Sequence, residues 1–138
     1  MSTAFPLQLH SVLDRGVPNE ERINFIAAED IDPRTYCLAV GIKLGTGRVV
    51  PFYDHFFWFG AGYVKAGDWI VVKTGTGQSL TEKHQDGIGT VYWVHWGRSD
   101  VLFTHGDIVP ILFRMEDIQI GKVVPPPPAT HPSQLLGR

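Results

Sequence analysis

Six histidines are the residues of this chain best suited to metal binding or acid–base chemistry. They are His10, His55, His84, His95, His105 and His131. None stands in a paired ligand spacing such as His-Glu-x-x-His, and the chain has no cysteine pair. A metal site could still form if facing strand ends converged. Its members would be Asp54, His55, His95, His105 and Asp107. A small metal-binding protein or enzyme is therefore one hypothesis, beside structural roles for each histidine.

The candidate nucleophiles are Ser79, Ser99 and Cys37, and none has a recognisable setting such as Gly-x-Ser-x-Gly. Cys37 lies within Thr-Tyr-Cys-Leu-Ala-Val, a context typical of a small buried apolar residue. The glycines of 41–47 fit neither a Walker loop nor a dinucleotide fingerprint, because no helix follows them. The sequence therefore predicts no catalytic residue and no cofactor, and it favours a protein that is not an enzyme.

Aromatic residues are concentrated in 51–59, the most apolar part of the chain. Consecutive side chains of a strand point to opposite faces, so one set should enter the core and the other should be exposed. Unless a bulge shifts the register, the two sets are Tyr53, His55, Phe57 and Phe59, and Phe52, Phe56 and Trp58. The candidate partner-binding residues are Phe52, Phe56, Phe57, Trp58 and Phe59.

Strands separated by frequent turn signals must position these residues. Apolar alternation and short apolar runs predict strands at 7–13, 22–28, 35–44, 48–59, 69–73, 90–96, 101–103, 108–115 and 118–124. The strand 69–73 is expected at the centre, with Trp69 buried between two sheets against Leu38 or Val40 and against Trp93. The polar segment 74–89 is expected to be an exposed loop.

The predicted strand 35–44 has large side chains on one face and small side chains on the other. Its large face holds Tyr36, Leu38, Val40 and Ile42. Its small face holds Cys37, Ala39 and Gly41. Small side chains permit another backbone or a large side chain to approach closely, so we expect such an approach on that face.

The composition is that of an ordinary globular domain, with 138 residues of which 43% are hydrophobic. A net charge of −2 gives no electrostatic drive toward nucleic acid, so none is expected as a partner. The N-terminus lacks the pattern of a signal peptide, and no apolar run has the length of a membrane span. The expected localisation is therefore cytoplasmic, with export or assembly without a classical signal as the alternative.

The expected fold class is all-β, an immunoglobulin-like β-sandwich of about seven to nine short strands. The chain contains 15 Gly and 10 Pro, a density of breakers that favours many short elements. The run Pro125–Pro128 marks the end of the domain, because proline cannot supply the donors of a strand ladder. We therefore expect a sandwich domain over 1–124 and a proline-rich tail over 125–138.

Several motifs follow one another in a recognisable order. Asn19-Glu20-Glu21 precedes an apolar strand, and an aromatic strand and a glycine turn lead to Lys65-Ala66-Gly67-Asp68 before a second apolar strand. Gly106-Asp107 begins the last main strand. In this order the chain resembles the lamin-tail domain, found at the end of intermediate filament proteins and in bacterial proteins. The resemblance implies an immunoglobulin-like sandwich that serves as an interaction or targeting module, with partners that differ among members.

Three functional hypotheses follow. The first is a non-enzymatic β-sandwich module that binds a protein partner or assembles with itself as a homo-oligomer. The second is the His/Asp metal-binding protein or enzyme described above. The third is a structural protein of a virus or filament.

Overall fold

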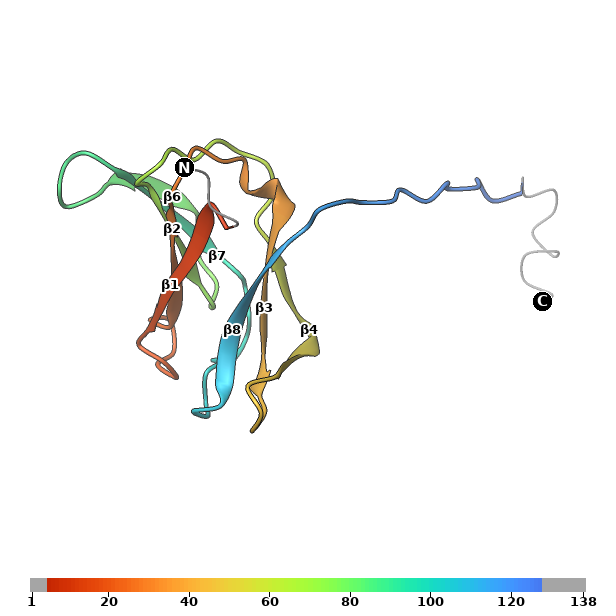
Figure 1. The fold of residues 1–138 in the computed structure, drawn as a ribbon, viewed down its shortest axis with the longest axis horizontal. Helices are drawn as coiled ribbons and strands as arrows, with labels where there is room; N and C mark the ends of the chain where they lie inside the picture. The colour runs from red at the N-terminus through yellow and green to blue at the C-terminus, as the bar shows by residue number, and fades with distance from the viewer. Residues whose placement is uncertain (1–4, 128–138) are drawn as a thin grey trace.

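The computed structural model describes residues 5–127 and arranges eight strands in two sheets that face each other (Figure 1). The strands are β1 Leu7–Leu13, β2 Arg22–Ala27, β3 Tyr36–Lys43, β4 Val49–Trp58, β5 Trp69–Lys73, β6 Leu80–Lys83, β7 Thr90–His95 and β8 Ile108–Arg114. One sheet has the order β1-β2-β5-β7-β6 and the other has the order β4-β3-β8. The expectation of an all-β fold is confirmed. Within 5–127 no helix has the length and hydropathy needed to cross a membrane.

Strand β5 lies in the middle of the five-stranded sheet, as its apolar sequence predicts. It pairs antiparallel with β2 and parallel with β7. A parallel pair needs a crossover, and the segment 74–89 provides it. This segment is not only a loop, because β6 lies within it and pairs antiparallel with β7. All four residues of β6 are exposed, so no apolar face marks the strand, and only its backbone ladder does.

The core lies between the sheets and takes side chains from both of them. From β5 it receives Ile70 and Val72, so alternation turns Trp69 to the outer face of the sheet. There the Trp69 ring contacts His10 and His84, with centroid distances of 4.9 and 6.0 Å. The prediction that Trp69 is buried between the sheets is therefore wrong, although the strand itself is correctly placed.

Strand β3 has the two faces that its sequence predicts. Tyr36, Leu38 and Val40 are fully or almost fully buried in the core, whereas Ile42 at the strand end is 36% exposed. On the small face, a Cβ atom at Gly41 would overlap the carbonyl oxygen of Val50 on β4. The expected close approach of another backbone is therefore confirmed at Gly41.

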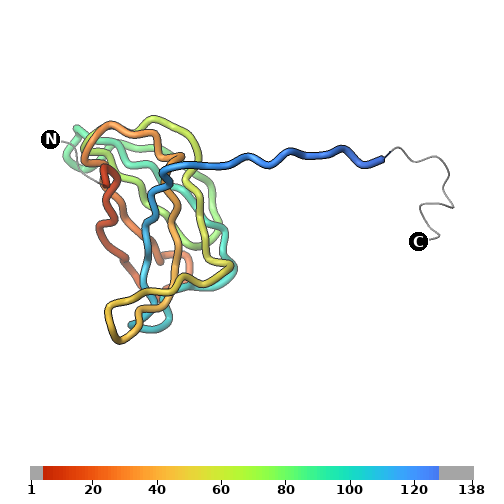
Figure 2. Tube along the Cα trace, turned by 45° about the vertical axis from the view of Figure 1, so that its right-hand side comes forward, coloured from red at the N-terminus to blue at the C-terminus, as the bar shows by residue number. Residues whose placement is uncertain are grey.

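Two predicted strands of the C-terminal half are absent from the described chain. Residues 101–103 form no strand, although Leu102 and Phe103 are buried in the core. Residues 118–124 also form no strand, and they run away from the two sheets after β8 (Figures 1 and 2). Residues 115–127 are almost all exposed, so their apolar side chains have no core to enter. The rest of the predicted tail, 128–138, lies outside the described residues.

One buried carboxylate joins segments that are distant in the sequence. Glu21 is 1% exposed and lies directly before β2. Its oxygens accept hydrogen bonds from the backbone amides of Gly16 at 2.8 Å, Leu102 at 2.7 Å and Phe103 at 2.9 Å. They also accept one from the Thr74 hydroxyl at 2.8 Å. The charge is therefore satisfied by fixed dipoles from three separate segments.

Replacing Glu21 should unfold the protein more easily. Glu21→Ala leaves four donors without their acceptor, three of them buried, so we expect the free energy of unfolding to fall by about 3 kcal/mol or more. Urea denaturation followed by tryptophan fluorescence measures this change. The matched control is Glu20→Ala, an exposed neighbour, which should stay within about 0.5 kcal/mol of the parent. Equal stability of the two variants would contradict the structural role of Glu21.

The domain boundary also stays a prediction that can be tested. Residues 115–124 form no strand in the structure, and we expect the sandwich to hold without the proline-rich segment. A chain ending at Val124 should melt within a few degrees of the full chain, as a change of well under 1 kcal/mol implies. Differential scanning calorimetry of both chains measures this. A large drop in melting temperature would show that the tail contributes to the domain.

Candidate functional site

A bulge in β4 decides which of its aromatic side chains face the core. Ala39 of β3 pairs with Phe56 and Gly41 pairs with Pro51, so five steps along β4 oppose two steps along β3. Strand β4 therefore has three more steps than β3 between these pairs. Because side chains alternate between the two faces of a strand, an odd number of extra steps exchanges the faces of β4 on the two sides of the bulge. Phe52 therefore packs against the core on the same side as Phe57.

The predicted partner-binding residues separate into two groups. Phe52, Phe57 and Phe59 pack against the core, where the rings of Phe57 and Phe59 meet edge to face at 5.7 Å. Placing Phe52 with Phe56 and Trp58 was wrong, because the bulge inverts the alternation between them. Phe56 is 47% exposed and Trp58 is 64% exposed, so these two remain available to a partner.

Phe56 and Trp58 belong to an apolar surface that spans the whole three-stranded sheet. The strand register places Cys37 between Trp58 and Phe113, and it places Ala39 between Phe56 and Ile111. These rows lie on the side of β3 that faces away from the core. We call this surface the outer aromatic face, and its members are Cys37, Ala39, Phe56, Trp58, Ile111 and Phe113. Sequence reasoning missed the members from β8, whose faces only the pairing with β3 reveals.

The large side chains of the outer aromatic face are held in place. The Trp58 Nε1–H donates to the carbonyl oxygen of Arg34 at 2.6 Å. The rings of Phe56 and Phe113 lie 6.2 Å apart across β3. Between them Cys37 is partly buried, and this burial raises the pKa of its thiol. The face is therefore a preformed apolar surface with small residues along its middle.

Two ion pairs lie at one end of this face. Arg34 Nε is 3.3 Å from Asp32 Oδ2, and Arg114 Nε is 4.0 Å from Glu116 Oε1. The Arg34 carbonyl oxygen accepts the hydrogen bond from Trp58, and Arg114 follows Phe113 in β8, so both pairs adjoin members of the outer aromatic face. The edge of the face therefore carries compensated charge, and the centre carries none.

Asp54 and His55 form a second polar cluster within the bulge of β4. His55 Nδ1 lies 2.7 Å from Asp54 Oδ1, and His55 Nε2 lies 3.4 Å from the Arg98 guanidinium. A guanidinium can only donate, so Nε2 accepts and Nδ1 carries the proton that is donated to Asp54. The hydrogen bond from His55 is the main cause that lowers the pKa of Asp54. Arg98 also donates to the Asp54 carbonyl oxygen at 3.0 Å.

This cluster connects the two sheets and does not present a free base. Arg98 follows β7, and Asp54 and His55 belong to β4, so their contacts cross from one sheet to the other. Nε2 is the atom that a general base would use, and a permanent donor already engages it. The arrangement therefore favours a structural role for His55.

The five residues of the predicted metal site do not come together. Asp54 and His55 form one pair, and His105 and Asp107 form a separate exposed pair with 3.8 Å between Nδ1 and Oδ2. His95 lies apart, with its ring against the backbone of Gly77. Within the described part of the chain, no group of three or more His, Cys, Asp or Glu side chains could hold a metal ion. His131 lies outside that part.

Comparison with known proteins adds no relative to these observations. The chain matches no protein-family model, no curated protein and no solved structure. The candidate sites therefore have to be judged on their own geometry.

The pKa of Asp54 gives a test of the His55 hydrogen bond. A carboxylate with a lowered folded pKa stabilises the protein above its ordinary pKa, and this contribution is lost as the pH falls through the folded value. His55→Ala should raise the pKa of Asp54 toward its ordinary range and remove that contribution. Titration of the carboxyl ¹³C signals by NMR measures it.

Asp86 is the internal control for this titration. Its pKa is lowered first by the backbone amides of Ile88 and Gly89, which His55 does not touch. It should therefore titrate identically in both proteins. An unchanged Asp54 pKa in His55→Ala would show that the hydrogen bond does not hold the carboxylate in solution.

Proposed function

We propose that this chain is a non-enzymatic interaction module, an immunoglobulin-like sandwich of the lamin-tail type. It associates with a second copy of itself through the outer aromatic face. The observation that carries the proposal is the exposure of large apolar side chains on one preformed surface, with Trp58 64% and Phe56 47% exposed. Monomeric proteins rarely expose a contiguous apolar surface of this kind without a partner for it.

The roles of the motif residues support the domain class. Of the two acidic residues before the apolar strand, Glu21 is buried and holds three segments together. Asp68 closes the turn 65–68 by accepting from the Lys65 amide at 3.0 Å, and it also accepts from the Thr90 amide at 3.0 Å. Gly67 has φ +91°, a conformation that favours glycine. The residues that carry the resemblance are thus those that fix the turns and strand ends.

Three features favour a second copy of this chain as the partner that covers the outer aromatic face. A two-fold interface brings identical surfaces together, so it requires a face that is self-complementary. The centre of the outer aromatic face is uncharged, and its rim carries both signs in the pairs Arg34–Asp32 and Arg114–Glu116. A second copy therefore meets no net repulsion. The Trp58 side chain is held by its hydrogen bond, so little conformational entropy is lost when it is covered.

Association should depend on Phe56 and Trp58. The double substitution Phe56→Ser and Trp58→Ser should weaken self-association by about 30-fold or more, the effect of losing an aromatic hot spot worth at least 2 kcal/mol. Sedimentation equilibrium over a range of concentrations measures the dissociation constant. The matched control is Ile88→Ser, which removes an 85% exposed apolar side chain from the loop before β7 and should associate like the parent.

Cys37 offers a second readout that needs no substitution. It lies at the centre of the outer aromatic face, and it is the only cysteine of the chain. Its alkylation by iodoacetamide should slow as the protein concentration rises, because association covers the thiol. Alkylation that is independent of concentration, together with a monomer mass in every sample, would overturn self-association. A monomer that captures a different protein through Trp58 would point to a heterologous partner in its place.

A further inference from the structure

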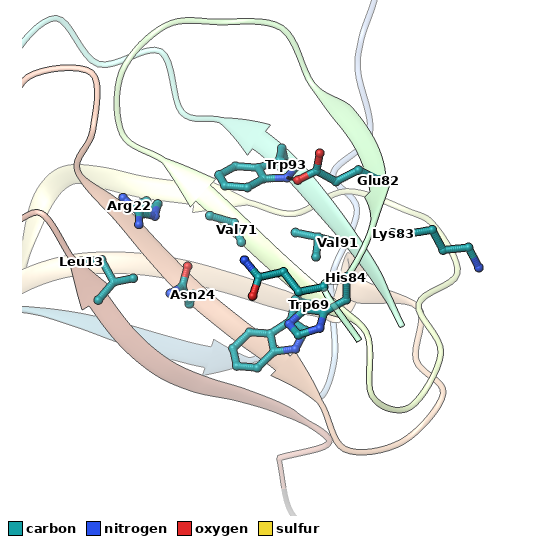
Figure 3. A pocket seen from close by; sticks show the side chains of 11 residues that line it. Leu13, Arg22, Asn24, Trp69, Val71, Glu82, Lys83, His84, Val91 and Trp93 are labelled. Atoms are coloured by element: carbon teal, nitrogen blue, oxygen red, sulfur yellow. Dashed lines mark hydrogen bonds between the residues drawn. The ribbon is translucent and has the colours of Figure 1, made fainter. Parts of the chain in front are cut away.

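The outer face of the five-stranded sheet carries a groove of about 340 Å³, on the side of the sandwich away from the outer aromatic face (Figure 3). Pockets of this size are at the lower end of those that bind small molecules. Its lining comes from β1, β2, β5, β6 and β7 and includes Asn24, Trp69, Val71, Glu82, Val91 and Trp93. The groove therefore depends on the assembled sheet and on no single segment.

The floor of the groove is apolar and its walls are aromatic. Val71 and Val91 lie on this outer face because the residues next to them in the strands point to the core. Their side chains are nevertheless almost buried, with 6% and 8% exposed. The register pairs Trp69 with Val91 and Val71 with Trp93, so the two indoles stand diagonally across the floor. Figure 3 shows both rings beside the two valines.

Both indoles are fixed by neighbouring polar groups. The Trp69 ring is stacked on His84 with 10° between their planes. The Trp93 Nε1–H donates to Glu82 Oε1 at 2.8 Å, and Lys73 Nζ lies 5.7 Å from the centre of the Trp93 ring. The turn that follows β6 is fixed as well, because Asp86 Oδ1 accepts from the Ile88 and Gly89 amides at 2.8 and 3.2 Å. The aromatic walls are thus preorganised.

A polar side chain on the floor has an unused acceptor. Asn24 is 9% exposed, and its Nδ2 donates to the Ser11 hydroxyl at 3.2 Å. Its Oδ1 is buried and has no hydrogen-bond partner among the described residues. Figure 3 shows Asn24 on the floor between Leu13 and Trp69. A buried carbonyl oxygen without a donor is unfavourable, so a hydroxyl donor that reaches Asn24 from the groove would be stabilising.

Charged side chains of both signs surround the groove, because Arg22, Glu82 and Lys83 line it and Lys73 lies beside Trp93. The Lys83 side chain points away from the groove (Figure 3). Arg22 Nη1 is 2.6 Å from Asp14 Oδ2, and the Glu82 carboxylate accepts from the Trp93 indole. An anionic ligand would compete with Asp14 for Arg22, and a cationic one would meet the positive charge of Lys73 beside Trp93. The groove therefore suits an uncharged ligand that has both an apolar face and hydrogen-bond donors.

We propose that this groove binds a neutral saccharide. A sugar ring has an apolar C–H face that can pack on an indole, and its hydroxyl groups can donate to Asn24 and exchange hydrogen bonds with the polar rim. The site is independent of the proposed self-association, because it lies on the other sheet and shares no residue with the outer aromatic face.

The four tryptophans allow the site to be tested within one spectrum. Each indole N–H gives its own signal in a ¹⁵N-labelled protein. Trp69 and Trp93 line the groove, Trp58 lies on the outer aromatic face and Trp96 packs against the core. One titration uses a β-1,4-linked glucose hexamer and another uses a free high-mannose N-glycan. These arms distinguish a polysaccharide from a glycoprotein glycan as the source of the sugar.

We expect the Trp69 and Trp93 signals to shift saturably in at least one arm below about 10 mM sugar, while Trp58 and Trp96 stay unchanged. Trp69→Ala and Asn24→Ala should each weaken this binding by about tenfold, with an unchanged circular dichroism spectrum. Trp58→Ala is the matched control and should bind like the parent. Movement of Trp58 alone would report on self-association and not on this site.

Several results would overturn the proposal. One is the absence of saturable shifts in both arms. Another is a shift of all four indoles to the same extent, which indicates a non-specific effect of the sugar. A third is tighter binding of a glucuronate hexamer than of the glucose hexamer, because it would show that the groove selects charge. Finally, unchanged binding by folded Trp69→Ala and Asn24→Ala would place the sugar elsewhere.

Discussion

The buried carboxylate of Glu21 is the interaction on which the rest of the sandwich depends. Its partners belong to the loop before β2, to the residue that follows β5 and to the segment that leads into β8. These segments are neighbours only in space. The last of them carries the chain from the five-stranded sheet to the three-stranded sheet, so one carboxylate fixes how the sheets are connected. A buried charge tolerates no loss of its donors, which makes this connection specific as well as stable.

Aspartates perform a similar task at the opposite end of β5. Asp30 Oδ1 accepts from the Ala66 amide at 2.8 Å and Oδ2 accepts from the Tyr63 hydroxyl at 3.0 Å, and these bonds lower the pKa of Asp30. Asp68 joins the same turn to the start of β7. The two strands therefore begin side by side, and this alignment places Trp69 next to Val91 in the groove. Turn chemistry thus shapes a surface that lies several residues away.

The two outer faces of the sandwich offer different chemistry built from similar residues. The outer aromatic face has small residues along its centre and compensated charges at its rim, which suits a broad and flat partner. The groove has an apolar floor with one amide oxygen that lacks a donor, and this agrees with the small ring with hydroxyl groups proposed as its ligand. In each case the face is defined by strand parity, because a side chain excluded from the core must point outward.

The sequence by itself determined the all-β class and most of the strands. Alternation in 35–44 and the apolar run in 69–73 predict the strands that form the middle of both sheets, because a buried strand needs apolar side chains. The small face of β3 also predicted a close backbone approach, which occurs at Gly41. Where local composition and core packing demand the same conformation, reading the chain was sufficient.

Only the tertiary structure decided which way several of these side chains face. Phe52 and Trp69 lie on the faces opposite to those predicted, since a bulge and the register of β5 set their parity. Strand β6 forms because its backbone pairs with β7. Its own residues are all exposed and show no apolar pattern that would predict this pairing. The separation of the His/Asp residues and the assembly of the groove also could not be predicted from the sequence. The distances between these residues depend on strand pairings between remote segments, and the periodicity within one segment carries no information about such pairings.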